Sequence, residues 1–152
     1  MLSRSILILP RLFLGVIFGV AVYPKLTAPS PGFRVMLLGF VQQLLPNAHP
    51  LYQSFLRAIV LPNAGTIAVL VMAGELLVAI GMLLGVTTRL AAVVAVFLLL
   101  NYMLAKGMSL WSPASNDAAD IIIAIVIGLG AAGRVFGIDS VLARRWPQIP
   151  LW

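Results

Sequence analysis

The chain has 152 residues, of which 62% are hydrophobic and 9% are charged, and its mean hydropathy is +1.10. Soluble domains carry about 25% charged residues, so this composition predicts one integral membrane domain spanning residues 1–152. The net charge of +6 does not indicate nucleic-acid binding, because the basic residues are scattered like the flanks of membrane spans. The absence of cysteine excludes disulfides, thiolate-ligated metals and a thiol nucleophile.

Four apolar segments are expected to be membrane spans, at about residues 6–26, 63–86, 88–106 and 117–136. The first segment resembles a signal peptide, but no clear small-x-small cleavage site precedes Pro24, so we expect it to be retained. The short turn at 85–89 predicts an antiparallel hairpin of the second and third spans. The expected fold is therefore all-α, a polytopic membrane four-helix bundle.

The segment 27–62, between the first and second spans, is predicted to be an amphipathic helical insertion. Apolar residues recur there at helical spacing, as in Phe33, Leu37, Phe40 and Leu44. We expect two short helices that lie on the membrane surface or fold across the outer mouth of the bundle. A fifth, kinked span is the alternative, but the prolines and polar residues of 46–50 argue against it.

The basic residues are divided unequally between the two ends of the expected spans. One end holds Arg4, Arg11, Arg89, Arg134, Arg144 and Arg145, and the other holds Lys25, Arg34, Arg57 and Lys106. The positive-inside rule then predicts that both termini are cytoplasmic. The linker 107–116, with Trp111 at headgroup depth, would face outward.

Glu75 is the strongest candidate for a functional residue. It lies roughly half-way along the apolar run between Pro62 and Arg89, near the expected bilayer midplane. An ionisable group at that depth costs at least about 2.5 kcal/mol unless it is paired, neutral or hydrated. We therefore expect Glu75 to face the bundle interior with a polar partner from another span. It is either a proton carrier or quinone partner, or a structural carboxylate paired with a base such as Arg11 or Lys25.

Two further carboxylates begin the fourth expected span. Asp117 suits the positive end of a helix, so a capping role is favoured for it. Asp120 shares a face with the small residues Ala124, Gly128 and Ala132, which predicts that it is buried. Asp120 is a second candidate for proton handling, with a purely structural role as the alternative.

Several polar and aromatic side chains are expected to meet at the outer mouth of the bundle. Lys25, Asn101, Tyr102 and Trp111 would lie there beside Asp117 and Asp120, and are candidate ligands for a quinone ring or a small anion. An ordinary interfacial belt is the alternative interpretation. No metal site is predicted, because His49 is the single histidine and no ligand cluster accompanies it.

Short motifs distributed along the chain resemble the DoxX family. They are Arg11-Leu12-Phe13-Leu14-Gly15, Pro24-Lys25-Leu26, Met72-Ala73-Gly74-Glu75-Leu76-Leu77, the run from Gly81 to Ala91, Asn116-Asp117, and Gly133-Arg134-Val135-Phe136-Gly137-Ile138-Asp139. The resemblance implies a small four-helix protein of a bacterial or archaeal cytoplasmic membrane. The family includes DoxD-like small subunits of thiosulfate:quinone oxidoreductase.

Two hypotheses follow from the residues and the resemblance together. The first is a membrane subunit of a quinone-linked redox system, in which Glu75 and Asp120 handle protons. A quinone is then the expected cofactor, and the electrons come from a partner or a direct substrate, since no intrinsic redox motif is present. The second is a non-catalytic accessory or scaffold subunit of a larger membrane complex. Both imply a lipid bilayer and other membrane subunits or further copies of the chain as partners.

Overall fold

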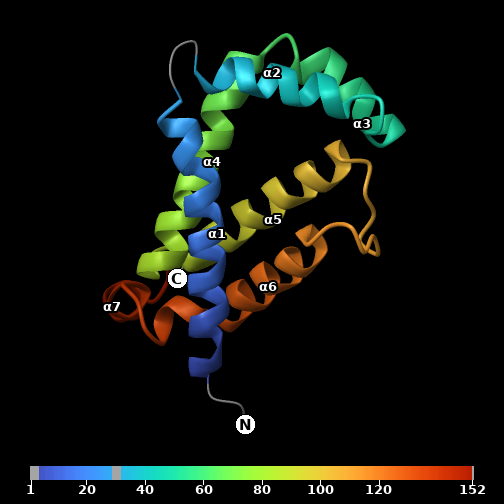
Figure 1. Cartoon of the computed structure of the whole chain (residues 1–152). Coiled ribbons are helices and arrows are strands. Elements are labelled where there is room, and N and C mark those ends of the chain that lie inside the picture. Colours follow the sequence, from blue (N-terminus) through green and yellow to red (C-terminus); the bar gives the residue numbers. More distant parts are fainter. Residues whose placement is uncertain (1–3, 29–31, 152) are drawn as a thin grey trace.

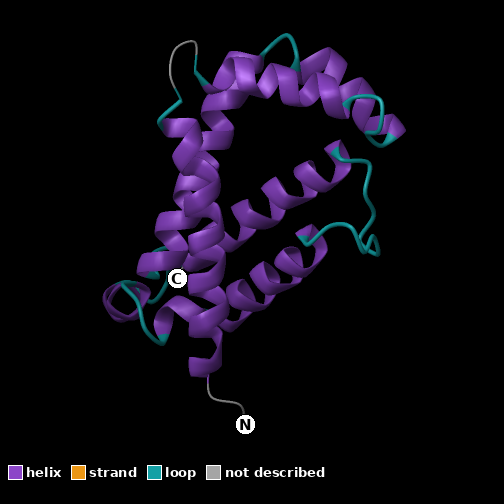
Figure 2. Cartoon of the chain, in the orientation of Figure 1, coloured by secondary structure: helices purple, strands orange, loops and turns teal. Residues whose placement is uncertain are grey.

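The computed structural model describes residues 4–28 and 32–151, and every regular element in these ranges is helical (Figure 2). The all-α class is therefore confirmed. In chain order the elements are η1 Arg4–Leu7, α1 Ile8–Leu26, α2 Phe33–Leu44, α3 Pro50–Phe55, the π-helical η2 Leu56–Val60, α4 Ala64–Leu84, α5 Thr88–Ala105, α6 Asp117–Gly130, η3 Ala132–Arg134 and α7 Asp139–Arg145.

Within the described ranges, three helices are long and apolar enough to cross a membrane: Ser5–Leu26, Ala64–Leu84 and Thr88–Ala105. They correspond to three of the four predicted spans. The fourth was predicted too long, because α6 ends at Gly130 instead of Phe136. Ala131 takes a left-handed conformation (φ 48°), which ends the helix. The 14 residues of α6 rise about 21 Å, less than the roughly 30 Å hydrocarbon core.

The four longest apolar segments share one core but are arranged as two helix pairs (Figure 1). Helix α1 packs along α4, and α5 packs along α6 at an inclination to the first pair. Glycines allow the close approaches, since a Cβ on Gly15 would lie 2.8 Å from Leu83 Cγ and one on Gly81 would lie 2.7 Å from Ala91 Cβ. The core is formed by side chains of all four helices, among them Leu14, Phe18, Val78, Met82, Leu98, Ala124 and Ile127.

Helices α2 and α3 form an arch across one end of the molecule (Figure 1). The insertion thus contains the two short helices predicted, with Leu37 buried and Phe40 half-exposed. Pro50 occupies the first turn of α3, where its missing N–H is no loss. The tip of the arch is attached to α5, because the backbone N–H of His49 donates to Leu104 O over 3.2 Å.

The opposite end gathers the start of α1, the α4–α5 turn and α7 (Figure 1). The buried Asp139 carboxylate accepts hydrogen bonds from the backbone N–H groups of Thr87 (2.6 Å) and Thr88 (2.9 Å). Arg11 donates to Ala132 O over 3.4 Å, and Arg89 donates to Pro150 O over 3.2 Å. Both ends of the described chain therefore lie on the side remote from the arch.

This arrangement gives the predicted orientation a direct test. The chain has no cysteine, so a single cysteine introduced at Ser109 or Val141, both exposed, is uniquely reactive. In intact cells we expect a membrane-impermeant maleimide to label Ser109→Cys but to label Val141→Cys only after permeabilisation. Equal labelling of both variants in intact cells would contradict the predicted topology.

Candidate functional site

Glu75 is buried between three helices, with 1% of its surface exposed. Its Oε1 atom forms an ion pair with Lys25 Nζ of α1 and accepts a hydrogen bond of 2.6 Å from the Tyr102 hydroxyl of α5. The prediction that Glu75 faces inward with a polar partner from another span is confirmed. Of the two bases considered, Lys25 is the partner, while Arg11 lies at the other end of α1.

The position of Lys25 follows from the register of α1 against α4. The two helices run antiparallel, with Gly15 beside Leu83 and Gly19 beside Ala79, so the last turn of α1 reaches the level of Glu75. The Lys25 ammonium also lies 5.3 Å from the centre of the Phe33 ring and 6.0 Å from that of Tyr102. These aromatic faces attract a cation, so they help to hold the lysine inside the protein.

A second polar contact joins the arch to α5. The Tyr52 hydroxyl of α3 donates to Asn101 Oδ1 over 2.6 Å, and Asn101 Nδ2 donates to Phe97 O over 2.7 Å. Burial raises the pKa of Tyr52 to about 12, so its hydroxyl stays protonated at neutral pH. The sequence predicted a second short helix in this part of the insertion, but Tyr52 was not identified as a site residue.

The Tyr102–Glu75 and Tyr52–Asn101 hydrogen bonds border a cavity of about 210 Å³. The cavity lies between the arch, the first half of α4 and the second half of α5. Its polar lining residues are Tyr52, Asn101 and Tyr102, and the others are apolar: Leu37, Phe40, Val41, Leu44, Phe55, Leu56, Val60, Ile67, Leu70, Val71, Phe97, Leu98 and Ala105. Leu70 and Phe97 are 60% and 64% exposed, so the cavity reaches the molecular surface. The result is an apolar chamber with a small polar region, which suits a ligand of the same character.

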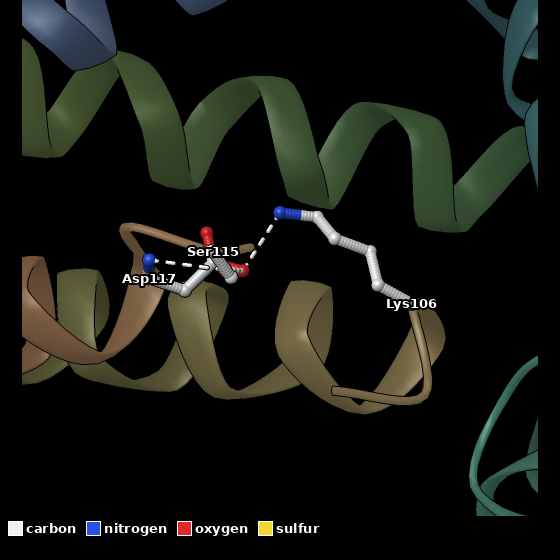
Figure 3. A network of polar contacts seen from close by, with 3 residues as sticks. All are labelled: Lys106, Ser115 and Asp117. Carbon is white, nitrogen blue, oxygen red and sulfur yellow. Dashed lines mark hydrogen bonds and ion pairs between the residues drawn. The ribbon is translucent and has the colours of Figure 1, made fainter. Parts of the chain in front are cut away.

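Lys106 and Asp117 form a separate ion pair at the start of α6 (Figure 3). Lys106 Nζ lies 2.7 Å from Asp117 Oδ2, and the Ser115 hydroxyl donates to the same oxygen over 2.7 Å. The Asp117 backbone N–H donates in turn to Ser115 Oγ over 3.2 Å. This network fixes the N-terminus of α6, in agreement with the structural role favoured for Asp117.

Of the predicted site residues, Asn101 and Tyr102 line the cavity, and Glu75 adjoins it only through its hydrogen bond with Tyr102. Lys25, Asp120 and Trp111 are not lining residues. Asp120 is buried as expected, but it is not a lining residue, and its carboxyl makes no hydrogen bond or ion pair within 4–28 and 32–151. Trp111 is 91% exposed in the linker before α6 and is also outside the cavity lining. Within the same ranges no three potential metal ligands among His, Asp and Glu come together.

Fold and cavity together define a helical integral membrane protein with a buried lysine–glutamate pair beside an apolar chamber. Residues 7–151 match the family model described as TQO small subunit DoxD, and the chain belongs to the DoxD family. TQO denotes thiosulfate:quinone oxidoreductase. The sequence motifs resembled the DoxX family, and the match refines this resemblance to the related DoxD family. A small subunit implies a larger complex. No curated protein and no solved structure matches the chain.

Proposed function

We propose that the chain is a membrane subunit of a quinone-linked redox system and that the cavity beneath the arch holds the quinone head group. The observation that carries the proposal is the composition of the cavity. Its walls are apolar, and Tyr52, Asn101 and Tyr102 supply its polar region. A quinone ring is itself flat and apolar with an oxygen at each end, so it matches both parts of the lining.

The dimensions of the cavity support a ring more than a whole lipid-like molecule. Its volume of about 210 Å³ lies below the roughly 300–1,000 Å³ typical of pockets for drug-sized ligands. We propose that the ring enters and that its tail leaves past Leu70 or Phe97 into the membrane. When bound, a quinone supplies two-electron, two-proton redox chemistry.

The side chains around the cavity have distinct proposed roles. Tyr52 and Tyr102 face the oxygen substituents of the ring, and Asn101 orients Tyr52 through their hydrogen bond. Glu75 holds a proton or releases it through Tyr102, to which its Oε1 is bonded. Its Oε2 is buried without a hydrogen-bond partner among the described residues, which leaves an acceptor for that proton. Lys25 balances the charge of Glu75.

Asp120 remains the second proposed proton-handling residue, acting from α6 instead of from the cavity wall. It lies near Asp117 at the end of α6 closest to the linker 107–116. In this proposal α6 serves as the fourth membrane helix of the bundle despite its length. Trp111 is assigned to the membrane interface, since its ring is almost fully exposed.

A non-catalytic scaffold is the second candidate function, and the exposed outer face of α5 favours it. Val93 and Phe97 are 67% and 64% exposed and face away from the core. Such a face suits lipid or a neighbouring membrane subunit. In a scaffold the Lys25–Glu75 pair would serve only to fix α1 against α4.

Two adjacent residues allow a matched test of quinone binding. Leu70 and Val69 are each 60% exposed on α4, but only Leu70 lines the cavity. We expect Leu70→Trp to weaken binding of a short-tailed benzoquinone by about tenfold or more, since the indole fills a chamber with little spare volume. Val69→Trp should bind as the unaltered chain does, measured by calorimetry in detergent.

Two results would contradict the cavity assignment. One is unchanged binding in Leu70→Trp, and the other is the same loss in Val69→Trp. A chain that binds no quinone but still co-purifies with its complex would favour the scaffold.

A further inference from the structure

We infer that the cavity binds the reduced, hydroxyl-bearing form of the ring more tightly than the quinone form. This inference rests on the proposed function and concerns the direction of the hydrogen bonds. The two tyrosine hydroxyls that border the cavity both donate their hydrogen to groups of the protein. They can therefore offer only lone pairs to a ligand.

The direction of the Tyr52 bond is fixed by Asn101. The Asn101 amide contacts Phe97 O over 2.7 Å, and a backbone carbonyl only accepts hydrogen bonds. The amide nitrogen must therefore face Phe97, which turns Oδ1 toward Tyr52. Because Oδ1 is also an acceptor, the Tyr52 hydroxyl must be the donor.

The direction of the Tyr102 bond is fixed by the ion pair. Glu75 Oε1 faces the Lys25 ammonium, which carries hydrogens and no lone pair. The paired carboxylate is an acceptor only, so the Tyr102 hydroxyl must donate to it. Lys25 itself is not a lining residue of the cavity, so its remaining hydrogens are not offered there.

The balance of donors and acceptors in the cavity is consequently uneven. Among the described residues that line the cavity, lone pairs remain on three side-chain oxygens, those of Tyr52, Tyr102 and the Asn101 amide. The Asn101 amide nitrogen retains a single unused hydrogen. A quinone carries two carbonyl oxygens that only accept hydrogen bonds. Most polar groups of the lining offer these oxygens no donor. A hydroquinone carries two O–H groups, which find acceptors at both tyrosines.

The preference has a consequence for the redox couple. Tighter binding of the reduced form makes the bound quinone easier to reduce. A tenfold preference corresponds to about 30 mV for this two-electron couple. The cavity thus favours the arrival of electrons on the ring, which suits a subunit that delivers them to quinone.

The test compares the two redox forms on the full chain purified in detergent. The probes are a short-tailed dimethoxy-methyl benzoquinone and its hydroquinone, each titrated calorimetrically without oxygen. We expect the hydroquinone to bind about tenfold more tightly, the effect of one or two net hydrogen bonds. Equal binding, or tighter binding of the quinone, would overturn this inference but leave the proposed site standing. If neither form binds, the proposed site itself is wrong.

A paired variant tests the cause of the preference. Lys25→Met with Glu75→Leu removes the ion pair and frees the Tyr102 hydroxyl to donate to a quinone carbonyl. The ratio of the two affinities should then fall to within about twofold. Lys106→Met with Asp117→Leu removes the Lys106–Asp117 ion pair, which does not line the cavity, and should keep the original ratio. An unchanged ratio in the first variant, or an equal fall in both, would refute the assigned hydrogen-bond directions. If the first variant does not fold, the inference is judged on the ratio of hydroquinone to quinone affinity in the unaltered chain.

Discussion

Replacing Lys25 by Met is expected to lower the free energy of unfolding by about 3–5 kcal/mol, because the Glu75 carboxylate then stays buried without its counter-charge. The pair is well shielded, with the side chains of Lys25 and Glu75 only 19% and 1% exposed. The Tyr102 hydroxyl remains as a partner but does not neutralise the charge. Thermal unfolding of the purified chain in detergent measures the effect.

The double variant is the informative control for this prediction. Lys25→Met with Glu75→Leu leaves no buried charge, and replacing a whole buried ion pair by apolar residues is often neutral or stabilising. We expect it to regain most of the lost stability. Lys106→Met should cost only about 1 kcal/mol, since Lys106 is 31% exposed and Ser115 still bonds Asp117. A stable Lys25→Met variant, or a double variant as unstable as the single one, would show that the pair is not the source of the effect.

Glu75→Gln is expected to reduce quinone-dependent turnover of the assembled complex by about a hundredfold or more, the usual contribution of a proton-transferring side chain. The amide keeps the shape of the carboxyl and can still accept from Tyr102 through its oxygen. It cannot take up a proton, so the proposed proton transfer is lost. The fold should be weakened but retained, because the amide oxygen can still accept a hydrogen bond from Lys25, whose side chain is 19% exposed. Turnover of the complex reconstituted in lipid vesicles, with assembly checked by size-exclusion chromatography, measures this result.

Asp117→Asn provides a matched comparison for that experiment. It makes the same change in a second ion-paired carboxylate, which stabilises the start of α6 and lies outside the cavity lining. We expect turnover within about threefold of the unaltered complex, because only a partly exposed pair is weakened. Full activity in Glu75→Gln would make Glu75 structural and would favour the scaffold function.

The sequence by itself determined the class of the protein and the direction in which Glu75 faces. Membrane spans are specified locally. An apolar run in the bilayer must form a helix to pair its own backbone N–H and C=O groups, whatever it packs against. The spans ending at Leu26, Leu84 and Ala105 were accordingly predicted to within about two residues. The inward orientation of Glu75 follows from the cost of a carboxylate in lipid, which is equally independent of its neighbours.

The partners of the polar residues were decided only by the tertiary structure. Both Arg11 and Lys25 belong to α1, and only the antiparallel register with α4 selects Lys25 for Glu75. The Tyr52–Asn101 bond joins residues 49 positions apart, because the arch folds back over α5. No local pattern encodes such a meeting, since it depends on how whole helices pack.

The two ends of α6 differ in the same way, since one was predictable from the sequence and the other was decided by tertiary packing. Its start at Asp117 was evident from the acidic residues that suit a helix N-terminus. Its end at Gly130 was not, because the apolar run continues beyond it. The chain must turn there so that Gly133 can pack against Thr88 and Asp139, where a Cβ would lie 2.2 Å from Thr88 Oγ1. That contact joins segments distant in the sequence, so packing overrides the local preference for helix.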